Sequence, residues 1–236
     1  MTSFVLRRNI RIRLVVLRLL LALVCSSMTM GGCSRVFTPA AAPAPSSAPA
    51  GSKQWTCDPL ADDALERENI VDAIRLHLGF LQSHPDNGLA YYHLGFAFGQ
   101  SGDQGSETKY YEKAVELGYA ENNIFYNLGM AYGEQKQYDK AERMFQRALE
   151  LNRTDAEPHF GLGLLYQSRG DEPRAEQELQ QAIALDPKHT DARATLAMLF
   201  AKAGKRDQAM AQLKAVLDID PEHRLARELY ERLSKQ

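Results

Sequence analysis

A pattern that recurs every 34 residues is the feature of this sequence that most constrains its fold. The clearest copy is the segment 122–155. One helical face of its first half carries Leu128, Gly129 and Tyr132, and one face of its second half is centred on Phe145. Apolar residues spaced three or four apart, on both sides of a polar turn, predict two amphipathic helices. A single hairpin of this kind cannot bury its apolar face, so it must stack against further copies.

The other copies fill the same columns with residues of similar size. The small column of the first helix holds Gly95, Gly129, Gly163 and Ala197. The large column of the second helix holds Tyr111, Phe145, Leu179 and Leu213. We expect the small residues to let the two helices of a hairpin cross closely, and the large residues to fill the space between hairpins.

Glycine and proline mark the turns of these copies. The turn between the two helices contains Gly102, Gly170 and Gly204. Glycine at this point predicts a backbone with positive φ, which other residues adopt only at a cost. The position just beyond the second helix holds Pro85, Pro187 and Pro221. A ring that lacks an N–H helps to end that helix.

This small–large pattern with its 34-residue period resembles the tetratricopeptide repeat (TPR) family. The resemblance covers residues 54–223 and implies an all-α fold, a TPR superhelix (α-solenoid) of antiparallel helix hairpins. On this basis we expect a degenerate N-terminal repeat at 55–87, four repeats over 88–223 and a C-terminal capping helix at 224–236. One departure is Glu107, which stands in a column that is usually small.

The first 32 residues resemble a bacterial lipoprotein signal peptide. They contain five arginines and no acidic residue. The mostly apolar run at 19–30 is too short to span the roughly 30 Å of a bilayer core. It leads into Met30-Gly31-Gly32-Cys33, which resembles the lipobox and implies cleavage before Cys33 and lipidation of that cysteine. An ordinary secreted protein and an uncleaved N-terminal anchor are the open alternatives.

A spacer at 33–54 follows the predicted lipidation site. Residues 38–52 are all Thr, Pro, Ala, Ser or Gly, a composition that builds no core and extends by about 3 Å per residue. In lipoproteins the residues after the cysteine direct sorting, and Ser34 resembles the default outer-membrane case. The sequence therefore predicts a lipid-anchored protein on the periplasmic face of the outer membrane.

The net charge of the chain argues against a nucleic acid or an anionic lipid surface as the partner. The chain has 28 basic and 30 acidic residues, and the five arginines are the only charged residues of 1–32. Cleavage would leave 23 basic against 30 acidic residues, a formal charge of −7. A nucleic-acid or anionic-lipid surface would need a basic patch instead.

The sequence contains no recognisable catalytic constellation, so we expect no enzyme activity, cofactor or metal site. None of the six histidines forms an i, i+4 pair, and there is no CxxC. His189 and His223 occupy the same repeat position, which predicts solvent-facing turns. Cys57 has no evident intrachain partner, so a buried thiol and a disulfide between chains are both open. An enzyme would require a cofactor that the sequence does not reveal.

The TPR resemblance also implies a concave inner face that binds a partner. The positions that match it are apolar or aromatic, and they are Tyr92, Phe96, Tyr126, Asn127, Met130, Phe160, Leu164 and Met198. We call these eight residues the predicted inner face. Carboxylate-clamp TPR proteins carry Lys, Arg and Asn there, and only Asn127, with Lys202 at the far end, resembles that set. A long apolar surface requires a cover, which is a partner segment, a second copy or the protein's own helices.

The layout of signal, spacer and repeats predicts a non-enzymatic scaffold for protein–protein interaction. It resembles the pilotin lipoproteins of type IV pilus systems, which bind a secretin subunit and help it to assemble in the outer membrane. It also resembles adaptor lipoproteins for cell-wall hydrolases. A self-associating structural lipoprotein is the third possibility.

Overall fold

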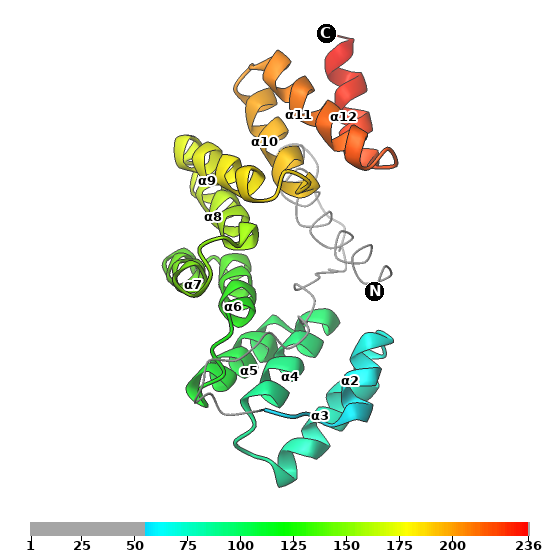
Figure 1. The fold of residues 1–236 in the computed structure, drawn as a ribbon, viewed down its shortest axis with the longest axis vertical. Coiled ribbons are helices and arrows are strands. Elements are labelled where there is room, and N and C mark those ends of the chain that lie inside the picture. The colour runs from blue at the N-terminus through cyan, green and yellow to red at the C-terminus, as the bar shows by residue number, and fades with distance from the viewer. Residues whose placement is uncertain (1–54, 236) are drawn as a thin grey trace, which may run out of the picture. The chain divides into compact units, whose positions relative to one another are not determined.

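The computed structural model describes residues 55–235. The predicted signal peptide at 1–32, the lipidation site Cys33 and the spacer at 33–54 lie outside the described residues. All regular secondary structure in the described part is α-helical, which confirms the predicted all-α repeat class (Figure 1). The helices are α2 (Pro59–Glu66), α3 (Ile70–Ser83), α4 (Gly88–Ser101), α5 (Gln104–Glu116), α6 (Asn122–Glu134), α7 (Tyr138–Leu151), α8 (Ala156–Arg169), α9 (Glu172–Leu185), α10 (Thr190–Lys202), α11 (Arg206–Ile219) and α12 (Arg224–Ser234).

The described chain forms two compact units, the first ending at Leu151 and the second beginning at Asn152. In the first unit, α2 packs on α3, α4 on α5 and α6 on α7. In the second unit, α8 packs on α9, α10 on α11, and α12 on α11. Within residues 55–235, every helix is too short or too polar to cross a membrane.

Backbone geometry explains where the helices begin and end. Asn87 starts α4 because its side chain accepts a hydrogen bond from the backbone N–H of Ala90 at 2.9 Å. The predicted positive φ at the turn glycines is confirmed, with 87° at Gly102, 78° at Gly170 and 73° at Gly204. The prolines of the repeat also follow the ends of α3, α9 and α11, as predicted.

The small column allows the close helix crossing that the sequence predicted. A Cβ added to Gly129 would lie 2.6 Å from the ring of Phe145. A Cβ added to Gly163 would lie 2.8 Å from the side chain of Leu179. Both distances are shorter than real Cβ contacts, so only glycine fits at these crossings without a shift of its neighbours.

The hairpin of α4 and α5 accommodates Glu107 in the column that is small elsewhere. Glu107 is buried, and the residue opposite its carboxylate is Gly99. A Cβ on Gly99 would lie 2.5 Å from Oε1 of Glu107. Because Gly99 on α4 has no side chain, the carboxylate of Glu107 on α5 fits beside it.

The two histidines at the equivalent inter-repeat position are buried, so the expectation of solvent-facing side chains is wrong. His189 begins α10, and its Nδ1 accepts a hydrogen bond from the backbone N–H of Ala192 at 3.3 Å. His223 begins α12 and accepts from Ala226 in the same way at 3.2 Å. A side chain that caps a helix turns back over its first turn, which brings the imidazole against the hairpin rather than into water.

Candidate functional site

Tyr92 joins the first helices of two successive hairpins in the first unit. Its hydroxyl accepts hydrogen bonds from Nδ2 of Asn123 at 3.0 Å and Nδ2 of Asn127 at 3.2 Å, which link α4 to α6. Its ring stacks on Tyr119 with 5.1 Å between the ring centroids. Tyr92 has no exposed surface, and burial raises the pKa of its hydroxyl far above the usual value. The hydroxyl therefore stays neutral and serves as an internal link between helices.

This placement corrects what we expected of three residues of the predicted inner face. Tyr92 fills the interior of the unit, so it is unavailable as an anchor for a partner. The side chain of Asn127 is engaged by Tyr92 and almost fully buried, which leaves no amide for a partner's carboxylate. Tyr126 is also buried, with its ring 6.0 Å from that of Phe145. For the two tyrosines the physical reason is ring size, because each ring reaches a neighbouring helix, and Asn127 is buried because its amide donates to the Tyr92 hydroxyl.

Phe96 and Met130 differ from these residues because both are only half-buried. They occupy the same repeat position on α4 and α6. Phe96 lies one helical turn beyond Tyr92, and Met130 lies nearly one turn beyond Asn127, so both follow the hydrogen bonds that join the two helices. In the first unit they are the members of the predicted inner face that keep accessible apolar surface.

In the second unit the predicted inner-face residues are buried. Phe160 on α8 has no exposed surface, and its ring centroid lies 4.8 Å from that of His189. This burial corrects its assignment as an anchor, because the ring packs inside the unit against the imidazole of His189, which precedes α10. Leu164 and Met198 keep less than a tenth of their surface exposed. Lys202 is paired with Glu172 at 2.6 Å, which satisfies the one cation expected at this end.

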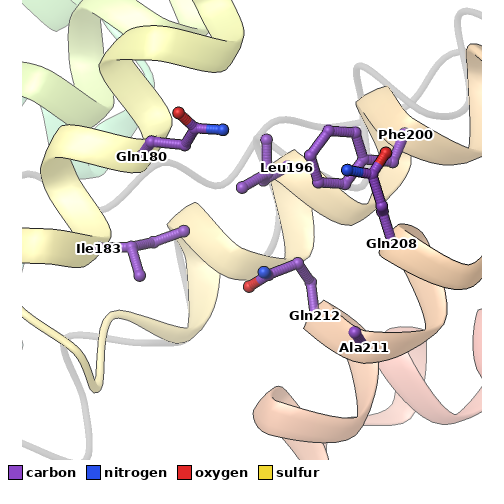
Figure 2. A pocket seen from close by; sticks show the side chains of 7 residues that line it. All are labelled: Gln180, Ile183, Leu196, Phe200, Gln208, Ala211 and Gln212. Carbon is purple, nitrogen blue, oxygen red and sulfur yellow. The ribbon is translucent and has the colours of Figure 1, made fainter. Parts of the chain in front are cut away.

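An open hollow of about 290 Å³ lies between α9, α10 and α11 in the second unit (Figure 2). In the close-up, Leu196 and Phe200 of α10 lie between Gln180 of α9 and the two glutamines of α11. Its lining residues are Gln180, Ile183, Leu196, Phe200, Gln208, Ala211 and Gln212. Because none of these side chains titrates near neutral pH or is a usual metal ligand, the hollow offers shape but no catalytic chemistry.

A cluster of four ligand-type side chains in the first unit was not predicted from the sequence. Cys57, Asp62, His77 and His93 each bring one ligand atom to the same place, with all four atoms within 4.8 Å of one another. Burial lowers the pKa of His77 to about 4, with a further contribution from His93, so its imidazole is neutral at neutral pH. Burial, and then the charge of Asp62, raises the pKa of the Cys57 thiol. These residues come from separate segments and form no sequence motif, so only their separate identities were visible in the sequence.

Paired helices with recurrent close crossings define a helical-hairpin repeat protein. Family models described as tetratricopeptide repeat match residues 89–117, 123–155, 144–177 and 168–233. The chain belongs to the tetratricopeptide repeat family, as its sequence pattern predicted. No curated protein matches the sequence.

Solved structures of similar fold include other TPR proteins. YrrB, described as a TPR protein with an unusual peptide-binding site, is 26% identical with a TM-score of 0.58, over 72% of this chain and 88% of its own. MamA is 24% identical with a TM-score of 0.62, over 71% of this chain and 98% of its own. PilF of Pseudomonas aeruginosa is 19% identical with a TM-score of 0.62, over 73% of this chain and 82% of its own. The likeness to MamA and PilF concerns the fold alone.

Proposed function

We propose that this protein is a non-enzymatic scaffold that binds an apolar or amphipathic segment of a protein partner. Stacked TPR hairpins form surfaces for protein recognition, and YrrB, a structure of similar fold, is described as having a peptide-binding site. The observation that carries the proposal is the accessible apolar pair Phe96 and Met130, held at equivalent positions by the hydrogen bonds of Tyr92. An aromatic ring supplies a large contact area at low entropic cost, and methionine adapts its shape to a ligand.

The proposed binding surface, made by Phe96 and Met130, is smaller than the predicted inner face. Tyr92 and its amide partners form a buried support, while Phe96 and Met130 make the contact. A helix with two apolar anchors can lie across α4 and α6 in this arrangement, as amphipathic helices do in apolar grooves. A carboxylate clamp has no support, because the amide of Asn127 and the amine of Lys202 are already engaged.

The proposed cellular role is that of an outer-membrane lipoprotein facing the periplasm, anchored through Cys33, with a pilotin-like part in the assembly of a secretin or pilus. The support is the layout of lipobox, spacer and repeats. The partner would then be an envelope protein, and the length of the spacer would let the repeats reach it away from the bilayer.

Photo-crosslinking in cells tests the binding surface. A photoreactive amino acid is placed at Phe96 or at Met130 of the full-length protein, with Val71 on α3 as the exposed control. We expect one and the same protein to be captured from positions 96 and 130, and not from 71. A captured secretin subunit supports the pilotin-like role, whereas a cell-wall hydrolase replaces it with the adaptor role. Capture of the protein's own copies, or of nothing, contradicts the proposal.

Two further measurements separate binding from folding and from anchoring. For the double variant Phe96→Glu/Met130→Glu, pull-down of the partner that crosslinking identifies is expected to fall by at least about tenfold, while the helical circular dichroism is unchanged. The variant Cys33→Ser is expected to leave the outer-membrane fraction. A mature wild-type protein that begins at a residue other than Cys33, as seen by mass spectrometry, argues against the anchor.

A further inference from the structure

Four side chains of metal-ligand type converge at the start of the first unit. Cys57 precedes α2, Asp62 lies on α2, His77 on α3 and His93 on α4. One potential ligand atom from each lies within 4.8 Å of the other three. The cluster therefore joins the first hairpin to the first helix of the next repeat.

His77 is a second, independent sign that this cluster binds something. Its side chain has no exposed surface, and neither ring nitrogen has a hydrogen-bond partner. A buried polar group without a partner costs free energy, so proteins rarely retain one without a use. Its Nε2 lies 3.9 Å from Oδ1 of Asp62, the oxygen that is 2.8 Å from Nδ1 of His93. This unpartnered nitrogen thus lies close to the other potential ligand atoms.

We propose that Cys57, Asp62, His77 and His93 bind a divalent transition-metal ion, with Zn²⁺ as the preferred ion. A thiolate, a carboxylate oxygen and two imidazole nitrogens are ligands that suit zinc in tetrahedral geometry. Ligands about 2.0–2.3 Å from zinc stand roughly 3.3–3.8 Å apart, so modest side-chain rotations complete the site. The Cys57 thiol releases its proton to solvent when its sulfur bonds to the metal.

Charge and access also agree with such an ion. One thiolate and one carboxylate balance the charge of Zn²⁺, so the occupied site is neutral and is tolerated inside the protein. Asp62 and Cys57 are both partly exposed, which leaves a path for the ion to enter. Four protein ligands fill a tetrahedron and leave no position for a substrate, so the role of the metal is structural.

The first hairpin has a physical need for this kind of link. Helix α2 has 8 residues, whereas the first helices of the following hairpins have 13 or 14. The buried core where α2, α3 and α4 meet contains Ala64, Ala73 and Ala97. Alanines bury little apolar area, and the larger apolar residues packed on them, Leu65, Ile70, Ile74 and Leu76, are only partly buried, so packing at this end leaves room for added stabilisation. An ion shared by α2, α3 and α4 compensates, because the free energy of metal binding also stabilises the fold.

Metal binding is tested on the full-length protein, purified in a mild detergent, stripped with a chelator and titrated with Co²⁺ and then Zn²⁺. We expect the intense visible bands of tetrahedral cobalt, a thiolate-to-cobalt charge-transfer band, and displacement by one equivalent of Zn²⁺ per chain. Zinc is also expected to raise the thermal melting temperature, because it binds the folded state. A wild-type protein that binds no cobalt in this geometry overturns the proposal.

Matched variants locate the site. Cys57→Ser and His93→Gln are expected to weaken zinc binding by at least about tenfold, and Cys57→Ser removes the charge-transfer band. His159→Gln is the control, because it breaks a histidine–carboxylate contact of 2.7 Å with Glu178 in the second unit. It should bind like the wild type. Cys57 is only half-buried, so its serine variant is expected to fold, and unchanged zinc affinity in both site variants places the metal elsewhere and refutes the assignment.

Discussion

Replacing Gly129 with alanine tests whether close helix crossing, rather than local helix preference, explains glycine in the first helix of each hairpin. Gly129 lies within α6, where alanine is favoured over glycine by about 1 kcal/mol. Local preference alone therefore predicts that Gly129→Ala stabilises the protein.

Packing predicts the opposite sign. The new Cβ would lie 2.6 and 2.8 Å from two carbons of the Phe145 ring, and that ring is only 2% exposed. A buried ring between two helices cannot turn away, so the helices must separate. Overpacking of this kind costs about 1–3 kcal/mol. After the gain in helix preference, we expect Gly129→Ala to be destabilised by about 1 kcal/mol.

Gly79→Ala provides the matched control. Gly79 lies inside α3 and is exposed, and an added Cβ would meet nothing within 4 Å. This variant should be stabilised by about 0.5–1 kcal/mol. Urea unfolding followed by circular dichroism should therefore move the midpoint down for Gly129→Ala and up for Gly79→Ala. If both substitutions raise the midpoint, the close-crossing argument is refuted.

Three further predictions concern buried polar contacts of the first unit. Tyr92→Phe removes the acceptor of two buried amide hydrogen bonds and should cost about 1–3 kcal/mol in urea unfolding, whereas Tyr91→Phe should change stability by less than about 0.5 kcal/mol. Asn87→Ala removes both the cap of α4 and the 2.7 Å hydrogen bond to the carbonyl of Thr56, at a cost of about 1–2 kcal/mol. Asn87→Asp keeps the cap and should recover part of that loss; no recovery would show that capping is unimportant there. Burial, and then a hydrogen bond to a carboxylate, raises the pKa of Tyr132, so the unfolded chain loses this proton at a lower pH than the folded one and stability falls as pH rises above about 10. Urea unfolding between pH 8 and 11 should show a shallower decline for Tyr132→Phe, and equal slopes would contradict the assignment.

The helical hairpins could be predicted because the turn and the helix crossing of each hairpin are set by the size of the residue at one position. Positive φ at Gly102 and close approach at Gly129 follow from the missing Cβ, whatever the rest of the chain does. The expectation for His189 failed because a turn position does not reveal whether a side chain caps the following helix. Glu107 was recognised as a departure, but only the structure showed that Gly99 provides its space.

The candidate sites were less predictable. The spacing of residues along a helix shows which face a side chain lies on, but not whether another helix buries that face. Tyr92 and Phe96 lie four positions apart on one face of α4, yet only Phe96 keeps accessible surface, because Tyr92 reaches the amides of α6.

Residue size and backbone freedom, which act locally, were enough for the sequence by itself to determine a stack of helix hairpins with its turns and crossings. Tertiary structure alone decided which apolar side chains remain accessible and that Cys57, Asp62, His77 and His93 meet. The reason is that both depend on how separate helices rotate and pack against one another, and this is set by the sum of many contacts rather than by any one position.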